Sequence, residues 1–196
     1  MLKNSNIQIV HLGNNHILNF GKSGVTDTKI FLDQGKIEYY GNTSLETSAT
    51  ERILIKQFGS STLAFVSFNQ FIDNGLETAL IDTAAADPLA DLVVVTPHWG
   101  NEYTSTAHSV IQDYAHQLVD AGADLIIGAH PHVTQQKEIY KNVPIYYSLG
   151  NFVFDQYFRP DTQRGLLLGV EIQTDKTLSF TEIPIRLLPS GQTELE

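Results

Sequence analysis

Hydrophobic positions in the middle of the chain follow two different patterns. Residues 91–96 and 124–127 are short continuous apolar runs, which are typical of strands buried on both faces. Between them, residues 106–121 carry apolar side chains at helical spacing, at Val110, Ile111, Tyr114, Leu118 and Val119. Gly122 follows directly and favours the end of a helix. The pattern therefore predicts a buried strand, an amphipathic helix and a second buried strand in succession.

The same reasoning extends to both ends of the chain. In the first half it predicts a strand at residues 7–12 and a helix at residues 24–32. A hairpin of residues 51–56 and 63–68, turning at Gly59-Ser60-Ser61, and a helix at residues 76–86 are expected to follow. In the second half it predicts strands alone, at residues 145–149, 165–173 and 178–186. Alternating elements followed by strands indicate an α/β sandwich with a mixed sheet, built as a single domain over residues 1–196.

Composition narrows the possible partners. The 196 residues include 42% hydrophobic positions, enough for one sizeable core. A formal charge of −10 argues against nucleic acid and anionic lipid, because binding of their phosphates depends on Lys and Arg. No apolar run reaches the length of a membrane span, and the first residues lack the apolar core of a signal peptide. Since the chain has no cysteine, any metal ligands must be His, Asn, Asp or Glu.

Polar clusters follow three of the predicted strands. They are Gly13-Asn14-Asn15-His16, His98-Trp99-Gly100-Asn101-Glu102 and Gly128-Ala129-His130-Pro131-His132. Strand ends are the usual positions of ligand groups in α/β folds, and imidazole with an amide oxygen suits Mn, Fe or Zn. Taken singly, the clusters could be a turn, a core pair and an exposed loop. Taken together they favour a metal site, whereas His11, His108 and His116 lie within predicted elements and are expected outside it.

These clusters and their surroundings resemble the capsule synthesis protein CapA family, which is associated with poly-γ-glutamate and shares the calcineurin-like metallophosphoesterase fold. The resemblance covers residues 2 to about 186. The segments that carry it are Gly13–His16 followed by Asn19-Phe20-Gly21, Pro97–Tyr103, Asp120–Asp124 leading into Gly128–His132, and Tyr147–Asp155.

The resemblance also implies roles for individual residues. Asn15, His98 and His130 would bind one divalent metal ion, and His132 a second, in a dinuclear site of Mn, Fe or Zn. His16 would act as the acid–base or phosphate-contacting group. Glu102 and Asn151 would support the ligands or contact the substrate, although a solvated loop carboxylate and a turn amide are the alternatives for these two.

The chain departs from the family pattern at its amino end. Family members begin with a strand carrying Asp and usually His, followed later by an Asp that bridges both metals. These ligands have no counterpart here, and Asn19 stands where the family usually has Asp. We therefore expect a chain that is N-terminally truncated relative to the family, with weak metal occupancy. We also expect an exposed sheet edge through which the chain associates with itself.

Three functions remain open at this point. The leading interpretation is a CapA-like protein of capsule and poly-γ-glutamate synthesis, with a metal-dependent phosphoesterase-type hydrolase site that is incomplete in this chain. The alternatives are a non-catalytic polymer-binding or assembly subunit on the same fold, and a general metal-dependent phosphodiesterase. The expected ligand is an anionic polymer or a phosphoester, and the family resemblance implies a location at the bacterial cell envelope.

Overall fold

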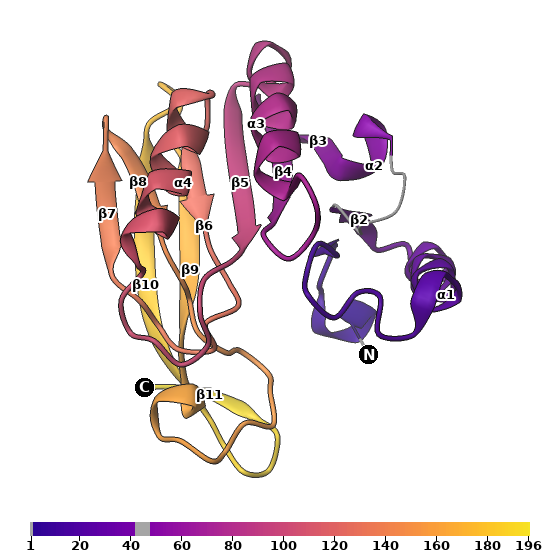
Figure 1. Ribbon diagram of the computed structural model, residues 1–196, viewed down its shortest axis with the longest axis vertical. Coiled ribbons are helices and arrows are strands. Elements are labelled where there is room, and N and C mark those ends of the chain that lie inside the picture. The colour runs from indigo at the N-terminus through magenta and orange to yellow at the C-terminus, as the bar shows by residue number, and fades with distance from the viewer. Residues whose placement is uncertain (1, 42–47) are drawn as a thin grey trace.

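The computed structural model describes residues 2–41 and 48–196, and its centre is a six-stranded mixed sheet (Figure 1). The strands follow the order β3-β4-β5-β6-β8-β7, with bounds Ile53–Phe58, Ser61–Asn69, Leu92–His98, Leu125–Ile127, Val143–Tyr146 and Lys137–Tyr140. The four inner strands run parallel to one another, and the two edge strands are antiparallel to their neighbours. The mixed sheet expected from the sequence is confirmed.

Helices α3 (Gly75–Ala86) and α4 (Ser109–Asp120) cover one face of this sheet (Figure 1). Successive side chains of a strand point to opposite faces, so alternate residues of β4 and β5 meet the helices. The resulting core is closed to solvent and contains Val66, Phe68, Val93, Val95, Trp99, Ile111, Leu118 and Tyr147. The fully buried Trp99 donates its ring N–H to the Tyr147 carbonyl at 2.9 Å, so its polar atom is satisfied within the core.

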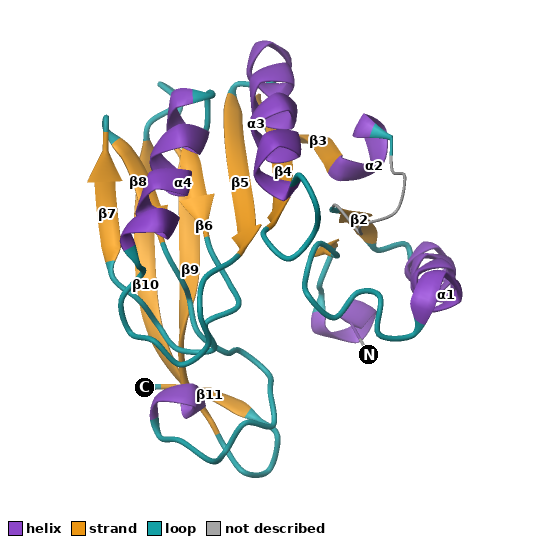
Figure 2. Cartoon of the chain, in the orientation of Figure 1, coloured by secondary structure: helices purple, strands orange, loops and turns teal. Residues whose placement is uncertain are grey.

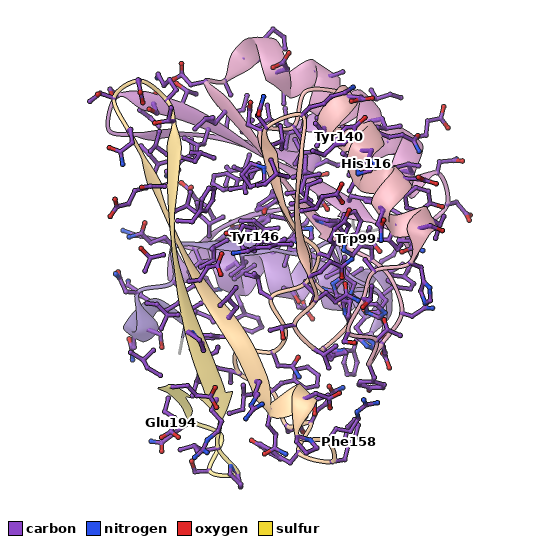
Figure 3. The ribbon with its side chains drawn as sticks, turned by 90° about the vertical axis from the view of Figure 1, so that its left-hand side faces the viewer. Trp99, His116, Tyr140, Tyr146, Phe158 and Glu194 are labelled. Atoms are coloured by element: carbon purple, nitrogen blue, oxygen red, sulfur yellow. The ribbon has the colours of Figure 1, made fainter. Side chains whose placement is uncertain are left out.

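The opposite face of the sheet packs against a long hairpin. Strands β9 (Arg164–Ile172) and β10 (Leu178–Leu187) pair antiparallel, and β11 (Thr193–Leu195) adds to β10. Figure 3 shows Tyr146 on the side of this hairpin and Trp99 on the side of α4. Tyr146 belongs to a second buried cluster with Leu63, Leu92, Val94 and Leu125, which are the alternate residues of the same strands. The molecule is therefore a sandwich with a helical layer, a central sheet and a smaller sheet.

The first 41 residues and α2 form a smaller lobe beside the sheet (Figure 1). It contains the short helix η1 (Leu2–Ser5), the parallel strands β1 (Ile9–His11) and β2 (Glu38–Tyr40), and the helices α1 (Gly21–Gly35) and α2 (Ala49–Arg52). Its buried apolar cluster consists of Leu12, Leu32 and Ile37. Two polar contacts join the lobe to the sheet. His11 Nε2 lies 2.7 Å from Ser67 Oγ, and Tyr40 Oη lies 2.8 Å from Thr96 Oγ1.

Most of the elements expected from the pattern are present, with shifted ends. The helix expected at 106–121 begins only at Ser109, and the strand expected at 145–149 covers Val143–Tyr146. The short strands β2, β7 and β11 and the single-turn helices η2 (Asp87–Leu89) and η3 (Asp161–Gln163) were not expected. Over the described parts of the chain, every helix is too short or too polar to span a bilayer.

Candidate metal centre

The carboxyl ends of the parallel strands place the polar clusters at one edge of the sheet. The parallel register brings Asn69 of β4 beside His98 of β5, and His98 forms an isolated parallel bridge with Ala129. The loops that follow these strands gather below that edge (Figure 2). The Trp99 backbone N–H donates to the Ala129 carbonyl at 3.1 Å and the Ala129 N–H donates to the Pro97 carbonyl at 2.9 Å, so backbone bonds hold the two histidine clusters side by side.

His98 contacts both Asn15 of the N-terminal lobe and His130 at the edge of the sheet. Its Nε2 lies 3.0 Å from Asn15 Oδ1, and its ring centroid lies 4.8 Å from that of His130. Asn15 follows Asn14, whose backbone carbonyl accepts a hydrogen bond at 3.1 Å from the buried Asn69 amide. The structure thus brings together Asn15, His98 and His130, which are separated by long stretches of sequence, and the fourth expected ligand, His132, has its ring centroid 5.9 Å from that of His130.

The loop that follows β6 holds its two histidines in unusual backbone conformations. His130 and His132 have φ of +103° and +61°, a region that only a few per cent of non-glycine residues enter. Gly128 begins this loop at a position without space for a side chain, because an added Cβ would lie 2.2 Å from the Tyr147 carbonyl oxygen. Strained non-glycine conformations concentrate at functional sites, where the surroundings hold a side chain in one working direction.

Two ring nitrogens at this edge suit a metal. His130 Nδ1 is buried and has no hydrogen-bond partner among the described residues, an energetic cost that a bound cation would remove. His132 Nδ1 lies 2.9 Å from Asn151 Oδ1, and the Asn151 amide donates its N–H to the Thr162 carbonyl at 3.0 Å. Since this second bond orients the amide, His132 carries its proton on Nδ1 and leaves the Nε2 lone pair free for a ligand.

Glu102 adds a carboxylate to the group. Ligand atoms of Glu102, His130 and His132 all lie within 4.8 Å of one another. Ions of the Zn type sit about 2.1 Å from each ligand, so atoms up to about 4.2 Å apart can share one ion without moving. The 3.0 Å between His98 Nε2 and Asn15 Oδ1 meets this condition, and Glu102 is exposed, so its carboxylate can rotate toward an ion beside the two imidazoles. The described residues therefore fit a metal ion.

Electrostatics keep the central histidines neutral, as metal ligation requires. Burial, together with repulsion from His130, His11, His132 and His16, lowers the pKa of His98 to about 3. Burial likewise lowers the pKa of His130 to about 4, an effect that Glu102 opposes in part. At neutral pH both rings are uncharged and offer lone pairs.

His16 lies at the solvent-exposed side of the centre. Its backbone N–H donates to Asn14 Oδ1 at 2.8 Å, and the Asn19 amide donates to its Nδ1 at 3.1 Å. An amide N–H can only donate, so neutral His16 carries its own proton on Nε2. Its charge contributes to the lowered pKa of both His98 and His130, which indicates that the ring is close to them.

The three other histidines occupy different environments. His11 packs on Tyr40 at 5.2 Å between ring centroids, His108 precedes α4 at the surface, and His116 stacks on Tyr140 at 3.9 Å. None of them belongs to the group formed with Glu102.

Sequence reasoning missed the structural part played by Asn69, whose side chain also accepts a bond from Phe71 N–H at 3.1 Å. Its position at the end of an apolar run was the available signal.

Comparisons with known proteins agree with this architecture. The sequence model of the family described as "Bacterial capsule synthesis protein PGA_cap" matches residues 1–156. The chain is 30% identical over 199 residues to the "PGA biosynthesis protein CapA" of Bacillus subtilis (strain 168), an alignment that covers 94% of this chain and 52% of that protein. The chain spans about half of the length of the curated relatives that it matches.

Two solved structures share the fold at low sequence identity. A hypothetical protein from Thermus thermophilus superposes with a TM-score of 0.61 at 16% identity, covering 92% of this chain and 79% of that chain. A putative 5'-nucleotidase from Staphylococcus aureus, solved in complex with α-ketoglutarate, gives a TM-score of 0.57 at 17% identity and covers 92% of this chain and 38% of that one. These likenesses show that the chain shares its α/β fold with both structures.

Proposed function

Because the chain belongs to the bacterial capsule synthesis protein family PGA_cap, we propose that it acts in poly-γ-glutamate capsule synthesis at the cell envelope as a metal-dependent hydrolase. The reaction would be cleavage of a phosphoester or of a glutamyl linkage. The observation that carries this proposal is the convergence of Asn15, His98 and His130, with His98 Nε2 3.0 Å from the Asn15 oxygen.

The ligand assignment follows from the contacts of each side chain. Asn15, His98 and His130 would hold one ion, and His132 and Glu102 would hold the second. Mn, Fe or Zn suits these nitrogen and oxygen ligands, and such ions activate water and stabilise negative charge on the oxygen that it attacks. Glu102, expected from the sequence to support ligands or contact substrate, is assigned here as a ligand because its carboxylate belongs to the His130 and His132 group.

The surrounding amides position the reacting groups. Asn151 holds the proton of His132 on Nδ1 and so directs Nε2 toward the centre. Asn19 holds His16 in the tautomer with the proton on Nε2, and this N–H would donate a hydrogen bond to a phosphate or carboxylate oxygen of the substrate. His16 is exposed, so a substrate can reach this proton without any rearrangement of the core.

Metal content and turnover test this proposal together. The purified chain is expected to retain Mn, Fe or Zn in elemental analysis and to cleave a chromogenic phosphodiester or a γ-linked glutamate oligomer when Mn²⁺ is added. His98→Ala should lower both metal content and turnover, by about a hundredfold in turnover. His108→Ala is the matched control, because His108 is an exposed histidine outside the centre. Equal metal content in the His98 variant and the unaltered chain would contradict the ligand assignment.

A non-catalytic polymer-binding subunit is the second candidate. It is favoured by the composition of the centre, since Glu102 is the single carboxylate in the ligand group found among residues 2–41 and 48–196. Four neutral ligands and one carboxylate offset little of the repulsion between two dications. Stoichiometric binding of one ion or none, with polymer binding but without turnover, would support this candidate over the hydrolase.

A further inference from the structure

We infer that Tyr103, Phe158 and Arg159 form a carboxylate-binding subsite beside His132 that selects an anionic glutamate oligomer. This inference deepens the proposed function and depends on it for the nature of the polymer. The three residues come from two loops, one after β5 and one after β8, which meet next to the candidate metal centre. Tyr103 is the link between them.

Tyr103 is held rigidly at both ends. Its backbone N–H donates to the Pro131 carbonyl at 2.8 Å, and its hydroxyl accepts a hydrogen bond from Gln156 Nε2 at 3.1 Å. Its φ of +61° is another uncommon conformation for a non-glycine residue. The ring stacks on His132 with a centroid separation of 6.1 Å. A ligand that contacts Tyr103 therefore lies next to a proposed metal ligand.

Arg159 offers a free edge of its guanidinium to a ligand. Its Nε and Nη2 donate to the two carboxylate oxygens of Asp161, at 2.9 and 2.6 Å, and its central carbon lies 5.3 Å from the Tyr103 ring centroid. The guanidinium has five N–H groups, and Asp161 takes two of them. The two on Nη1 and the second on Nη2 have no partner among the described residues. Their parallel N–H groups match a second carboxylate, with Asp161 acting as the positioning residue.

Apolar rings complete the subsite. Phe158 packs edge-on against Tyr103 at 5.5 Å and is 65% exposed, and it projects at the lower end of the molecule in Figure 3. The Phe154 ring centroid lies 4.9 Å from that of His132, and Phe154 is also exposed. Large exposed aromatic side chains gathered in one place mark binding surfaces. A glutamate unit offers what this surface recognises, because it carries a carboxylate and a short run of methylene groups.

The negative charge of the whole chain makes the Arg159 guanidinium important for binding an anionic oligomer. With a formal charge of −10, the protein repels polyanions in general, so a local cation such as the Arg159 guanidinium must supply the attraction. Arg159 lies at the rim of the centre, where it can hold one unit of the oligomer while another occupies the metal ligands. An oxyanion ligand could also be a phosphate, which would use Arg159 but gain nothing from Phe158.

The test measures binding in chelator, so that it is independent of metal and turnover. Fluorescence anisotropy of a labelled γ-linked glutamate oligomer should give saturable binding to the unaltered chain, weakened by salt. Arg159→Gln should weaken it about three- to tenfold, and Arg159→Lys by less, since Lys keeps the charge but loses the paired geometry. Phe158→Ala should weaken glutamate binding and leave inorganic polyphosphate binding unchanged. Lys141→Gln is the matched control, because Lys141 is an exposed base paired to Asp120 at the opposite end of β8.

Several outcomes would overturn the inference. The first is that the unaltered chain does not bind the glutamate oligomer. The second is that Arg159→Gln binds the oligomer as tightly as the unaltered chain, and the third is that Lys141→Gln loses as much affinity as Arg159→Gln. Equal competition by polyphosphate with no effect of Phe158→Ala would show an unselective anion site and would also overturn it. If the chain proves inactive or free of metal while Arg159-dependent binding persists, the hydrolase proposal fails and this inference stands.

Discussion

The helix-covered side of the central sheet and the N-terminal lobe contribute to the same site with very different support. His98 is the last residue of β5 and His130 follows β6, and both strands lie in a closed core that contains Trp99, Tyr147 and the inner residues of α3 and α4. Asn15 and His16 belong to a lobe whose buried cluster has three members, and polar contacts join that lobe to the sheet. One half of the centre is therefore built on rigid packing, and the other is docked onto it.

This difference indicates how ligand binding and folding are coupled. Regions with few buried apolar contacts open locally at lower free energy than the core. A ligand that needs both Asn15 and His98 binds only when the lobe is docked, so it would stabilise the docked state by mass action. Substitutions in the core and at the docking contacts should therefore differ in their effects on stability.

The largest effect is expected from Trp99→Ala, which acts on the core alone. Trp99 is fully buried and contacts Phe68 and Tyr147. Truncation leaves a large cavity and an unpaired Tyr147 carbonyl, and should cost about 3–5 kcal/mol in the free energy of unfolding. Urea unfolding followed by circular dichroism measures this. A loss below about 1 kcal/mol would show that the sheet core is not the more stable region.

A smaller effect is expected from Asp82→Asn, which acts where α2 meets α3. Asp82 is buried and receives two hydrogen bonds from Arg52, at 2.6 and 2.7 Å. Breaking a buried ion pair is strongly destabilising, and partial exposure of Arg52 reduces the expected cost to about 2 kcal/mol. Asp120→Asn, which breaks the exposed pair with Lys141, is the control and should leave the urea midpoint unchanged. Equal effects of the two variants would contradict the role of burial.

The two regions also differ in how far the sequence could predict them. In the core, continuous apolar runs and a helical stripe predicted β5, β6 and α4, because burial on both faces leaves a clear pattern. The polar clusters were expected at strand ends, and in the structure His98 is the last residue of β5 while His130 and His132 lie in the loop after β6. The short strands β2 and β7 lack a comparable pattern, since one residue of β2 and none of β7 is buried. Contacts between distant segments, such as Asn69 with Asn14 and Phe158 with Tyr103, depend on tertiary packing that no local pattern records.

The pH dependence of stability tests the docking contacts. Burial lowers the pKa of His11 to about 4 from an ordinary value of 6.5. The folded state therefore binds fewer protons than the unfolded state between these values, and stability is complete above pH 6.5 and falls as the pH drops toward 4. The loss in the free energy of unfolding that is due to His11 should reach about 1 kcal/mol near pH 5.5.

His98 and His130 add losses of the same sign, so His11 must be isolated by comparison. Urea unfolding in chelator, at neutral pH and near pH 5.5, should show a smaller pH-dependent loss for His11→Gln than for the unaltered chain. Equal losses in the two proteins would mean that His11 is accessible to protons in the docked lobe and that its contact with Ser67 does not exclude them.

The smallest and most local effect is expected from Tyr40→Phe, and its location is more informative than its size. The Tyr40 hydroxyl bonds to Thr96 Oγ1 at 2.8 Å and joins β2 to β5. Its removal should cost about 0.5–1.5 kcal/mol. Because Thr96 keeps a bond to the Val66 carbonyl at 3.3 Å, the sheet itself loses little. Hydrogen exchange should therefore quicken in β1 and β2 while β5 stays protected.

Tyr146→Phe is the matched variant on the other layer of the sandwich, since it removes a hydroxyl bond to Glu182 at 2.9 Å. It should quicken exchange in β8 and β10 and leave the lobe unchanged, because Tyr146 packs in the cluster between the sheet and the hairpin. If Tyr40→Phe instead quickens exchange in β5 as much as in β1, the lobe and the sheet open as one cooperative unit. Asn15 would then be held by the same packing as His98, and ligand binding would have no separate docking step to stabilise.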